Sequence, residues 1–449
     1  MGLPRIGARF ERSYLVWAAA FVVLTGLASL SATRPTIAAV VIGGFVYFII
    51  LSKAGIWRTM VGTSMLVSFL RSGATAAALS GAAWYVLQFV PILIAGLASL
   101  REEPHGIRNA DRKVILFMVL FAVDALATNI TTLAPAATFP QTILLVAMTG
   151  FLLFTYTRRW TSKDMVRGDV SMVFVLITTV QLVSVGAVAA GESWAFDPDY
   201  GRFRGLFSNA NYAGMMSAIG IAIGFYLLRG SRRRVPVLAS MVALAAAMLM
   251  SGSRGALLAL GIAALVLILT RTGRKVILPL GGLASVGAMI ALLINPHAFD
   301  PLKKFFFRDG GSNDITSGRL NIYQWMLRMF QRSPWTGTGY RSVEALSPWG
   351  MPGHDIYLTV LTEMGLLGAF LFACLMIAVL VASRNRKASR PLLVVAVTVA
   401  AAELTESAMY GWGGPTALTE WLIVLAFAAS GRFLSGGAPT HEAASLPRR

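Results

Sequence analysis

The sequence predicts an all-α, polytopic integral membrane protein. Of its 449 residues, 56% are hydrophobic and only 13% are charged. Soluble domains carry about 25% charged residues, and the mean hydropathy here is +0.68, so lipid must be the solvent for most of the chain. Apolar runs of about 20 residues, the length of a helix that crosses a bilayer, recur along the chain and predict about 12 to 14 transmembrane helices.

The first apolar run, residues 14–32, is longer than the core of a signal peptide, so we expect it to be retained as a helix. The clearest further runs are residues 37–51, 84–100, 114–127, 142–155, 170–190, 212–228, 235–250, 256–269, 276–294, 356–382, 392–409 and 416–433. The weakest pattern is residues 59–81, which contain Arg71 and many small residues. We favour two passes between residues 59 and 100, since an even number of helices leaves both termini on one side.

Basic residues are concentrated in short loops, and this predicts an orientation. The basic loops are residues 101–113, 158–167, 229–234, 271–275 and 384–390. An excess of Lys and Arg is typical of cytoplasmic loops. The loops that alternate with them, residues 128–140, 191–211, 251–255, 295–353 and 410–415, then face the other side. In a bacterium with two membranes, this predicts an inner-membrane protein with the second set in the periplasm and both termini in the cytoplasm.

We expect a single transmembrane catalytic domain, residues 1–434, followed by a disordered cytoplasmic tail, residues 435–449. The domain includes one long periplasmic loop, residues 295–354. Within this loop a capping serine precedes an amphipathic stretch, residues 318–331, which predicts a helix at the membrane interface. The apolar face of that helix carries Ile322, Met326, Met329 and Phe330.

The rare residue types argue against several kinds of site. The only cysteine, Cys374, lies in an apolar run, and the four histidines are scattered without metal-ligand spacing. We therefore expect neither a metal nor a cofactor. The net charge of +19 comes from loops between apolar runs and not from a basic domain. Cytoplasmic loops beside anionic lipid headgroups explain it, and we expect no nucleic-acid partner.

Several arginines lie on the side of the membrane from which positive charge is usually depleted. Arg202 and Arg204 share one outer loop, Arg254 lies in a tight turn between two spans, and Arg319 and Arg341 lie in the long loop. A charge at the depth of Arg254 costs ~2.5 kcal/mol or more unless it is paired. This cost favours a functional role over the alternative of a side chain that only reaches up to water. Guanidinium groups match phosphate oxygens bidentately, so these side chains indicate an anionic, lipid-linked substrate.

His354 ends the long loop where the chain re-enters a membrane helix. An imidazole with an ordinary pKa of about 6.5 can take a proton near neutral pH, so His354 is the candidate general base. The alternative is a solvated or helix-capping histidine. The next residue, Asp355, either contacts an acceptor sugar or begins the helix as an N-terminal acid, and the sequence leaves both roles open.

Four motifs, in this order, resemble the O-antigen ligase and polymerase superfamily. They are residues 202–211 (RFRGLFSNAN), residues 251–255 (SGSRG), residues 317–319 with Pro334, Gly337 and Gly339, and His354-Asp355 followed by Gly365 and Gly368. Together they cover residues 202–368, and the residues before 202 match only in hydropathy. The sequence departs from the family at Asp355, where asparagine, serine or glutamine is usual, and at Ala210, where proline is usual. Both departures leave the subfamily open.

The resemblance implies a fold similar to the GT-C class of glycosyltransferases. It implies a metal-independent, inverting transfer of a glycan from undecaprenyl diphosphate to an acceptor hydroxyl at the periplasmic face. In that reaction Arg204 or Arg202, together with Arg254, holds the diphosphate, and His354 is catalytic. Further candidate contacts to the substrate or within the loop are Arg319, Arg341, Asp355, Asn211 and Tyr357.

Three functions compete. The first is an O-antigen ligase, which attaches O-antigen to the lipid A core of lipopolysaccharide. The second is a polymerase of O-antigen or exopolysaccharide repeat units, whose acceptor is another lipid-linked glycan. The third is a polytopic transporter or flippase, but the duplicated halves or paired broken helices expected of one are not evident in the sequence. Besides the undecaprenyl-diphosphate-linked donor and the acceptor, we expect contact with membrane lipid.

Overall fold

A computed structural model of the chain describes residues 55–72, 81–100, 109–197, 201–228, 234–268, 319–383, 390–411 and 416–433. Within these ranges the chain is helical, and its one extended pairing is an isolated bridge between Phe196 and Phe203. The predicted all-α, multi-pass membrane protein is therefore confirmed. The predicted spans at residues 14–32, 37–51 and 276–294 and the tail at residues 435–449 lie outside the described residues. The total of 12 to 14 spans stays a prediction.

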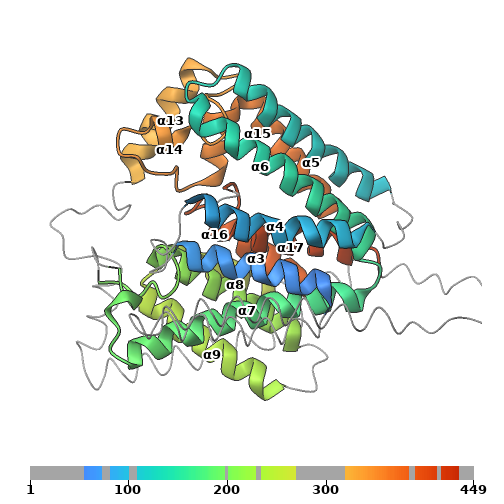
Figure 1. The fold of residues 1–449 in the computed structure, drawn as a ribbon, viewed down its shortest axis with the longest axis vertical. Helices are drawn as coiled ribbons and strands as arrows, with labels where there is room; N and C mark the ends of the chain where they lie inside the picture. The colour runs from blue at the N-terminus through green and yellow to red at the C-terminus, as the bar shows by residue number, and fades with distance from the viewer. Residues whose placement is uncertain are drawn as a thin grey trace, which may run out of the picture.

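Six described helices are long and apolar enough to cross a membrane (Figure 1). They are α5 (Asn109–Ala127, continued by η2, Thr128–Ile130), α6 (Pro135–Phe154, continued by the π-helical η3, Thr155–Arg159), α7 (Lys163–Ala189), α8 (Ala210–Leu228), α9 (Arg234–Ser251) and α15 (Ile356–Ala382). The shorter helices are α3 (Ile56–Ser72), α4 (Gly81–Ser99), η4 (Ser193–Ala195), α10 (Arg254–Ile268), α13 (Arg319–Arg332), α14 (Val343–Leu346), α16 (Arg390–Ala402) and α17 (Ala417–Ser430). Most bounds lie within a few residues of the predicted apolar runs.

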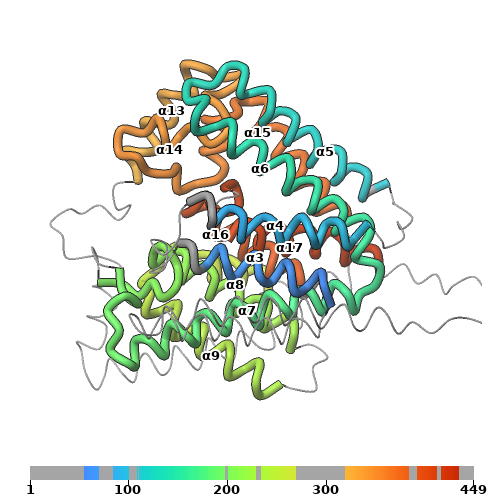
Figure 2. Tube along the Cα trace, in the orientation of Figure 1, coloured from blue at the N-terminus to red at the C-terminus, as the bar shows by residue number. Residues whose placement is uncertain are grey.

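The helices near the C-terminus, α16 and α17, pack against helices that precede them by many residues in the chain. Helix α16 contacts α8 and α10, and α17 contacts α7, α15 and α16. Figure 2 traces this path, with α16 and α17 lying between the group α5, α6 and α15 and the group α7, α8 and α9. Helices α13 and α14 lie together at one end of the group α5, α6 and α15 (Figure 1). This arrangement brings the end of the long loop and the turn after α16 to the same end of the molecule.

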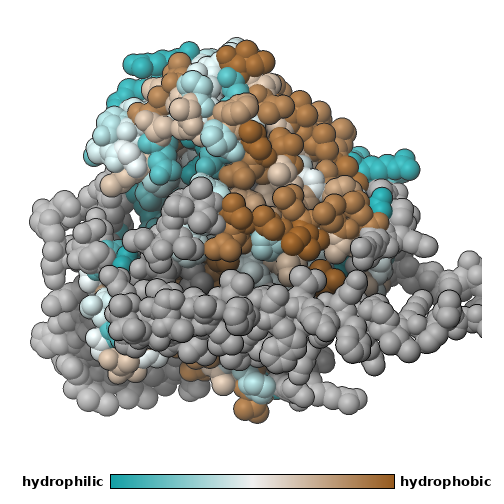
Figure 3. Space-filling model, viewed as in Figure 1, coloured by the Kyte–Doolittle hydropathy of each residue, from teal (hydrophilic) through white to brown (hydrophobic). Residues whose placement is uncertain are grey.

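Burial differs sharply between the central and the peripheral helices. Every residue of α17 is buried, whereas α4, α5 and α9 expose large apolar side chains such as Leu97, Val123 and Val242. Figure 3 shows a broad hydrophobic surface over the group α4, α5, α6 and α15, and hydrophilic surface gathered where α13 and α14 lie. Lipid tails are as apolar as leucine, so an outer face of this kind needs no protein partner.

Helix α15 is kinked at Gly365, and the end of the long loop fills the kink. Gly365 has φ 66° and ψ −164°, a conformation that is essentially restricted to glycine. The break frees backbone groups that pair with the loop: Leu366 donates its N–H to the carbonyl of Pro334 (2.8 Å), and Gly339 donates to the carbonyl of Glu363 (2.9 Å). A Cβ on Gly365 would overlap the backbone of Trp335. The first glycine of the G-x-x-G motif is therefore where the loop docks.

The predicted span at residues 392–409 is too long, because α16 ends at Ala402. The amides of Leu404 and Thr405 bond three residues back rather than four, which tightens and ends the helix. The carbonyl of Glu403 accepts the N–H of Ile356 (3.0 Å), and its carboxylate accepts the N–H of Met409 (3.2 Å). Residues 403–411 thus form a polar turn that is hydrogen-bonded to the start of α15.

Candidate active site

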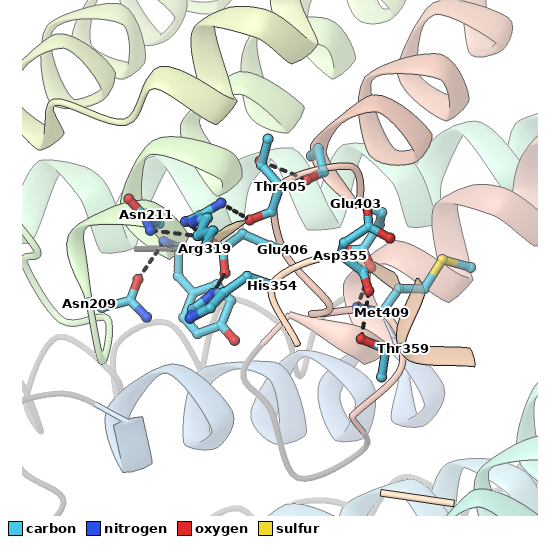
Figure 4. A network of polar contacts seen from close by, with 12 residues as sticks. Asn209, Asn211, Arg319, His354, Asp355, Thr359, Glu403, Thr405, Glu406 and Met409 are labelled. Atoms are coloured by element: carbon cyan, nitrogen blue, oxygen red, sulfur yellow. Dashed lines mark hydrogen bonds and ion pairs between the residues drawn. The ribbon is translucent and has the colours of Figure 1, made fainter. Parts of the chain in front are cut away.

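The site is organised around Glu406, which lies in the turn after α16 and is only 4% exposed. Its Oε2 lies 3.2 Å from Nδ1 of His354. Its Oε1 accepts hydrogen bonds from Nη2 of Arg319 (2.9 Å) and from Nδ2 of Asn211 (2.8 Å). Figure 4 shows the three partners converging on this carboxylate from α13, from α8 and from the segment before α15. One buried side chain therefore joins three elements that are far apart in sequence.

The electrostatics of Glu406 determine what His354 can do. Burial acts to raise the pKa of Glu406, but the hydrogen bond with His354 and the charge of Arg319 outweigh it and hold the pKa below its usual range. An ionised carboxylate can only accept hydrogen bonds, so Nδ1 of a neutral His354 must carry the proton. Nε2 then has a free lone pair and can take a proton from another group, while Glu406 stabilises the cation that forms.

The backbone around His354 is held in an unusual conformation. His354 has φ 55°, in the left-handed region that only a few per cent of residues other than glycine adopt, with asparagine, aspartate and histidine the most frequent among them. The next residue, Asp355, caps α15, because its Oδ1 accepts the N–H of Leu358 at 2.7 Å. Of the two roles left open by the sequence, this geometry provides the one at the start of the helix.

Arg202 and Asn211 belong to the same network. Arg202 donates to the backbone carbonyl of Ser251 (2.8 Å) and to Oδ1 of Asn211 (2.9 Å). Asn211 then donates to Glu406, so its amide relays the contact between the arginine and the carboxylate. Asn209, just before α8, accepts the N–H of Tyr212 (2.9 Å) and so orders the first turn that carries Asn211.

Arg204 and Arg254 flank this network in different ways. Arg204 donates through Nε to the carbonyl of Trp194 at 3.4 Å and forms no ion pair with a described residue. Arg254 is the first residue of α10, after a turn in which Gly252 has φ 60°. A Cβ on its neighbour Gly255 would overlap the side chain of Thr405. The start of α10 therefore lies against the turn that carries Glu406.

The structure does not place two other candidates in this network. The backbone N–H of Arg341 donates to the carboxylate of Glu363, and its guanidinium donates to Glu344 (3.1 Å). Tyr357 donates its hydroxyl proton to the carbonyl of Ala400 (3.1 Å). Among the described residues, no group of three or more His, Cys, Asp or Glu side chains is arranged to hold a metal ion.

Glu406 is the residue that sequence reasoning missed, because the predicted span at residues 392–409 placed it inside a helix. The signal was present: Glu403, Glu406 and Glu420 are three carboxylates in the otherwise apolar stretch 392–433. Ionisable residues at membrane depth are costly and indicate function by default. The cost that favours a functional role for Arg254 applies equally to these acids.

Comparison with known proteins covers part of this site. Residues 239–373 match a family model described as O-antigen ligase. The matched region runs from α9 into α15 and contains Arg254, Arg319 and His354, while Arg204 and Glu406 lie outside it. No curated protein matches the chain. The family match supports, over residues 239–373, the resemblance to the O-antigen ligase and polymerase superfamily.

Proposed function

We propose that this member of the O-antigen ligase and polymerase superfamily is an O-antigen ligase, which moves a glycan from undecaprenyl diphosphate to a hydroxyl of the lipid A core. The family match supports glycosyl transfer of the ligase or polymerase type. The observation that carries the assignment of chemistry is the pairing of His354 with Glu406 at 3.2 Å, because it leaves a basic nitrogen on a side chain that is 19% exposed.

In the proposed reaction, Nε2 of His354 takes the proton of the acceptor hydroxyl as that oxygen attacks the anomeric carbon of the donor. The bond from the anomeric carbon to the diphosphate oxygen breaks, and undecaprenyl diphosphate leaves with the electron pair. A single displacement inverts the anomeric configuration. Glu406 stabilises the imidazolium that results, as a carboxylate paired with an imidazole does in general acid–base catalysis.

Arg204 and Arg254 are proposed to stabilise the negative charge that develops on the diphosphate. Arg204 suits this role because its guanidinium pairs with no described carboxylate. Arg202 is already engaged with Ser251 and Asn211, which favours a role in holding the network. This contrast separates two arginines that the motif alone leaves equivalent. Since arginines supply the charge, the proposed mechanism needs no metal.

The remaining parts of the proposal concern location. The described chain is a multi-pass membrane protein. We propose that it lies in the inner membrane with the site facing the periplasm and both termini in the cytoplasm, an orientation that the basic loops support. Residues 1–434 are proposed to form one catalytic domain. The described part of the long loop, residues 319–354, then lies beside the site on the face that donor and acceptor lipids of the outer leaflet can reach.

The test uses purified protein in liposomes, supplied with undecaprenyl-diphosphate-linked glycan and lipid A core. We expect glycan on the lipid A core, and we expect the His354→Asn variant to lose transfer by roughly 10²-fold or more. Asparagine tolerates the left-handed backbone, so the substitution removes the base without adding strain. His354→Gly, which also fits this backbone, should recover part of the activity with added imidazole.

The products decide between the competing functions. Longer lipid-linked glycan without glycosylated lipid A core would replace the ligase by the polymerase. Wild-type activity in a well-folded His354→Asn variant would overturn the proposed mechanism. Movement of the donor across the bilayer without any new glycosidic bond would favour a flippase.

A further inference from the structure

Helix α13 contacts both members of the His354–Glu406 pair with side chains one helical turn apart. Arg319 donates to Oε1 of Glu406 at 2.9 Å and also to the backbone carbonyl of Thr405. Tyr323, four residues later and so on the same face of the helix, donates its hydroxyl proton to the carbonyl of His354 at 3.2 Å. Because the pair is joined by its own hydrogen bond, α13 closes a ring of contacts around the site.

The helix is fixed to the protein by a second set of contacts. Its apolar residues Ile322 and Met326 are buried in a cluster with Val343, against which Leu358 of α15 packs. A Cβ on Gly353 would overlap the hydroxyl of Thr359 and meet the end of the Met326 side chain, so the glycine lets the segment before His354 pass close to α13 and α15. The apolar face predicted to lie at the membrane interface is therefore buried against the loop and α15.

The backbone conformation of His354 explains why its contacts with α13 matter. A residue other than glycine keeps a φ of 55° only when its surroundings impose it. Two contacts impose it here: Tyr323 holds the carbonyl of His354, and the N–H of Ile356, just beyond the cap Asp355, is held by Glu403. The direction of the imidazole therefore depends on α13 as well as on Glu406.

We propose that Tyr323 and Arg319 are positioning residues through which α13 assembles the catalytic pair, so that the site is complete only while α13 is docked. This inference rests on the proposed glycosyl transfer and extends it to how the site is controlled. Tyr323 sets the orientation of His354 through its backbone. Arg319 sets the position and the charge of Glu406.

The charges that face the pair come from several elements. Arg319 of α13 contacts Glu406 directly, and Arg202 reaches it through Asn211. Glu403 of the same turn and Glu420 of α17 are further carboxyl groups that interact with Glu406, and Asp355 adjoins His354 in the chain. Arg319 is the positive charge in direct contact with Glu406, so its removal makes the site more negative and favours a protonated imidazole.

The positioning role of Tyr323 is tested with the Tyr323→Phe variant. Its transfer kinetics are measured in liposomes, with the acceptor that the wild type uses. We expect kcat to fall about tenfold, the scale of one lost hydrogen bond, while KM for the lipid-linked donor stays within about twofold. Phenylalanine keeps the packing of the ring, so folded yield should not change. If kcat and the folded yield of this variant fell by the same factor, Tyr323 would have a purely structural role and the proposal would be wrong.

Arginine 319 is tested by the pH profile of kcat/KM. We expect Arg319→Gln to move the acid limb of the kcat/KM profile to higher pH, because loss of the positive charge favours the protonated form of the base. Arg319→Lys, which keeps a positive charge, should bring the profile most of the way back to that of the wild type. Arg328→Gln is the matched control, since Arg328 is an exposed arginine of the same helix. It should leave both the profile and kcat unchanged.

The outcomes separate this inference from the proposed function. An inactive wild type would remove the proposed function. An active wild type with Tyr323→Phe at wild-type kcat, or with Arg319→Gln on the wild-type pH profile, would overturn the role of α13 and leave the proposed function standing.

Discussion

At the scale of single residues, Glu406 is the side chain on which the chemistry of His354 depends. Its carboxylate receives hydrogen bonds from Arg319 and Asn211 on one oxygen and faces Nδ1 of His354 with the other. A carboxylate saturated in this way stays ionised and fixes the tautomer of the imidazole. The free lone pair on Nε2 is a consequence of Glu406 and not of His354 alone.

Glu406→Gln tests this dependence. The amide keeps the size of the side chain, and its oxygen can still accept from Arg319, but its NH₂ group would face Nδ1 and place the imidazole proton on Nε2. We expect kcat to fall by roughly 10²-fold or more with little change in KM. The control is Glu344→Gln, which removes a carboxylate of α14 that is 52% exposed. Wild-type kcat for Glu406→Gln would show that the tautomer does not matter.

At the scale of elements, the kink in α15 joins the long loop to the membrane helix. The freed backbone groups at Glu363 and Leu366 pair with Gly339 and Pro334. The buried carboxylate of Glu363 also accepts the N–H of Val343 at 2.8 Å, which ties down α14. The distorted turn of α15 therefore holds the part of the loop that follows α13.

Gly365→Ala tests the importance of this kink. The backbone at Gly365 is nearly forbidden to alanine, and a Cβ would overlap the backbone of Trp335, so we expect a loss of ~1–3 kcal/mol in folding free energy together with lower kcat. Gly261→Ala is the control, because a Cβ there meets nothing within 4 Å. In a helix interior that change should be neutral or stabilising by up to ~1 kcal/mol. Thermal unfolding in detergent and liposome kinetics measure both, and equal effects of the two substitutions would contradict the docking role.

At the scale of the whole molecule, two neighbouring acids make opposite contributions to stability with pH. The pKa of Glu406 lies below its usual range, because His354 and Arg319 outweigh burial. Burial, the main cause, and the charge of Glu420 raise the pKa of Glu403 well above its ordinary value of 4.5. Glu406 therefore adds stability above its unfolded pKa, and this is lost as pH falls through its folded pKa. Glu403 favours folding at low pH, and that advantage is lost as pH rises from the unfolded towards the folded pKa.

Melting temperatures in detergent from pH 4 to pH 8 check this pattern. Relative to wild type, Glu406→Gln should be destabilised at pH 7 and progressively less so towards pH 4. Glu403→Gln should be stabilised at pH 7 relative to pH 4, because the amide has no charge to bury and no proton to take up on folding, and its oxygen can still accept the N–H of Met409. Differences from wild type that do not change with pH would contradict both assignments.

The sequence by itself determined the class of the protein and most of its helices. Apolar length is a local property, so α15 was predicted at residues 356–382 and α13 at residues 318–331, each within one residue of its bounds. The pattern failed where a helix ended for non-local reasons: α16 stops at Ala402 because the turn that follows bonds to the start of α15. Arg254 is identifiable from the sequence because charge at membrane depth is costly wherever it occurs, and His354 because it ends the long loop where the chain re-enters a helix.

Only the tertiary structure decided which of these residues act together. Glu406 follows His354 by 52 residues, and Asn211 and Arg319 reach it from α8 and α13, so no spacing in the chain could predict their convergence. The same holds for the two arginines of the RFR motif, of which Arg202 is engaged in the network and Arg204 pairs with no described carboxylate. Hydrogen bonds require atoms to meet within about 3 Å, and for segments this far apart the packing of the helices sets those distances.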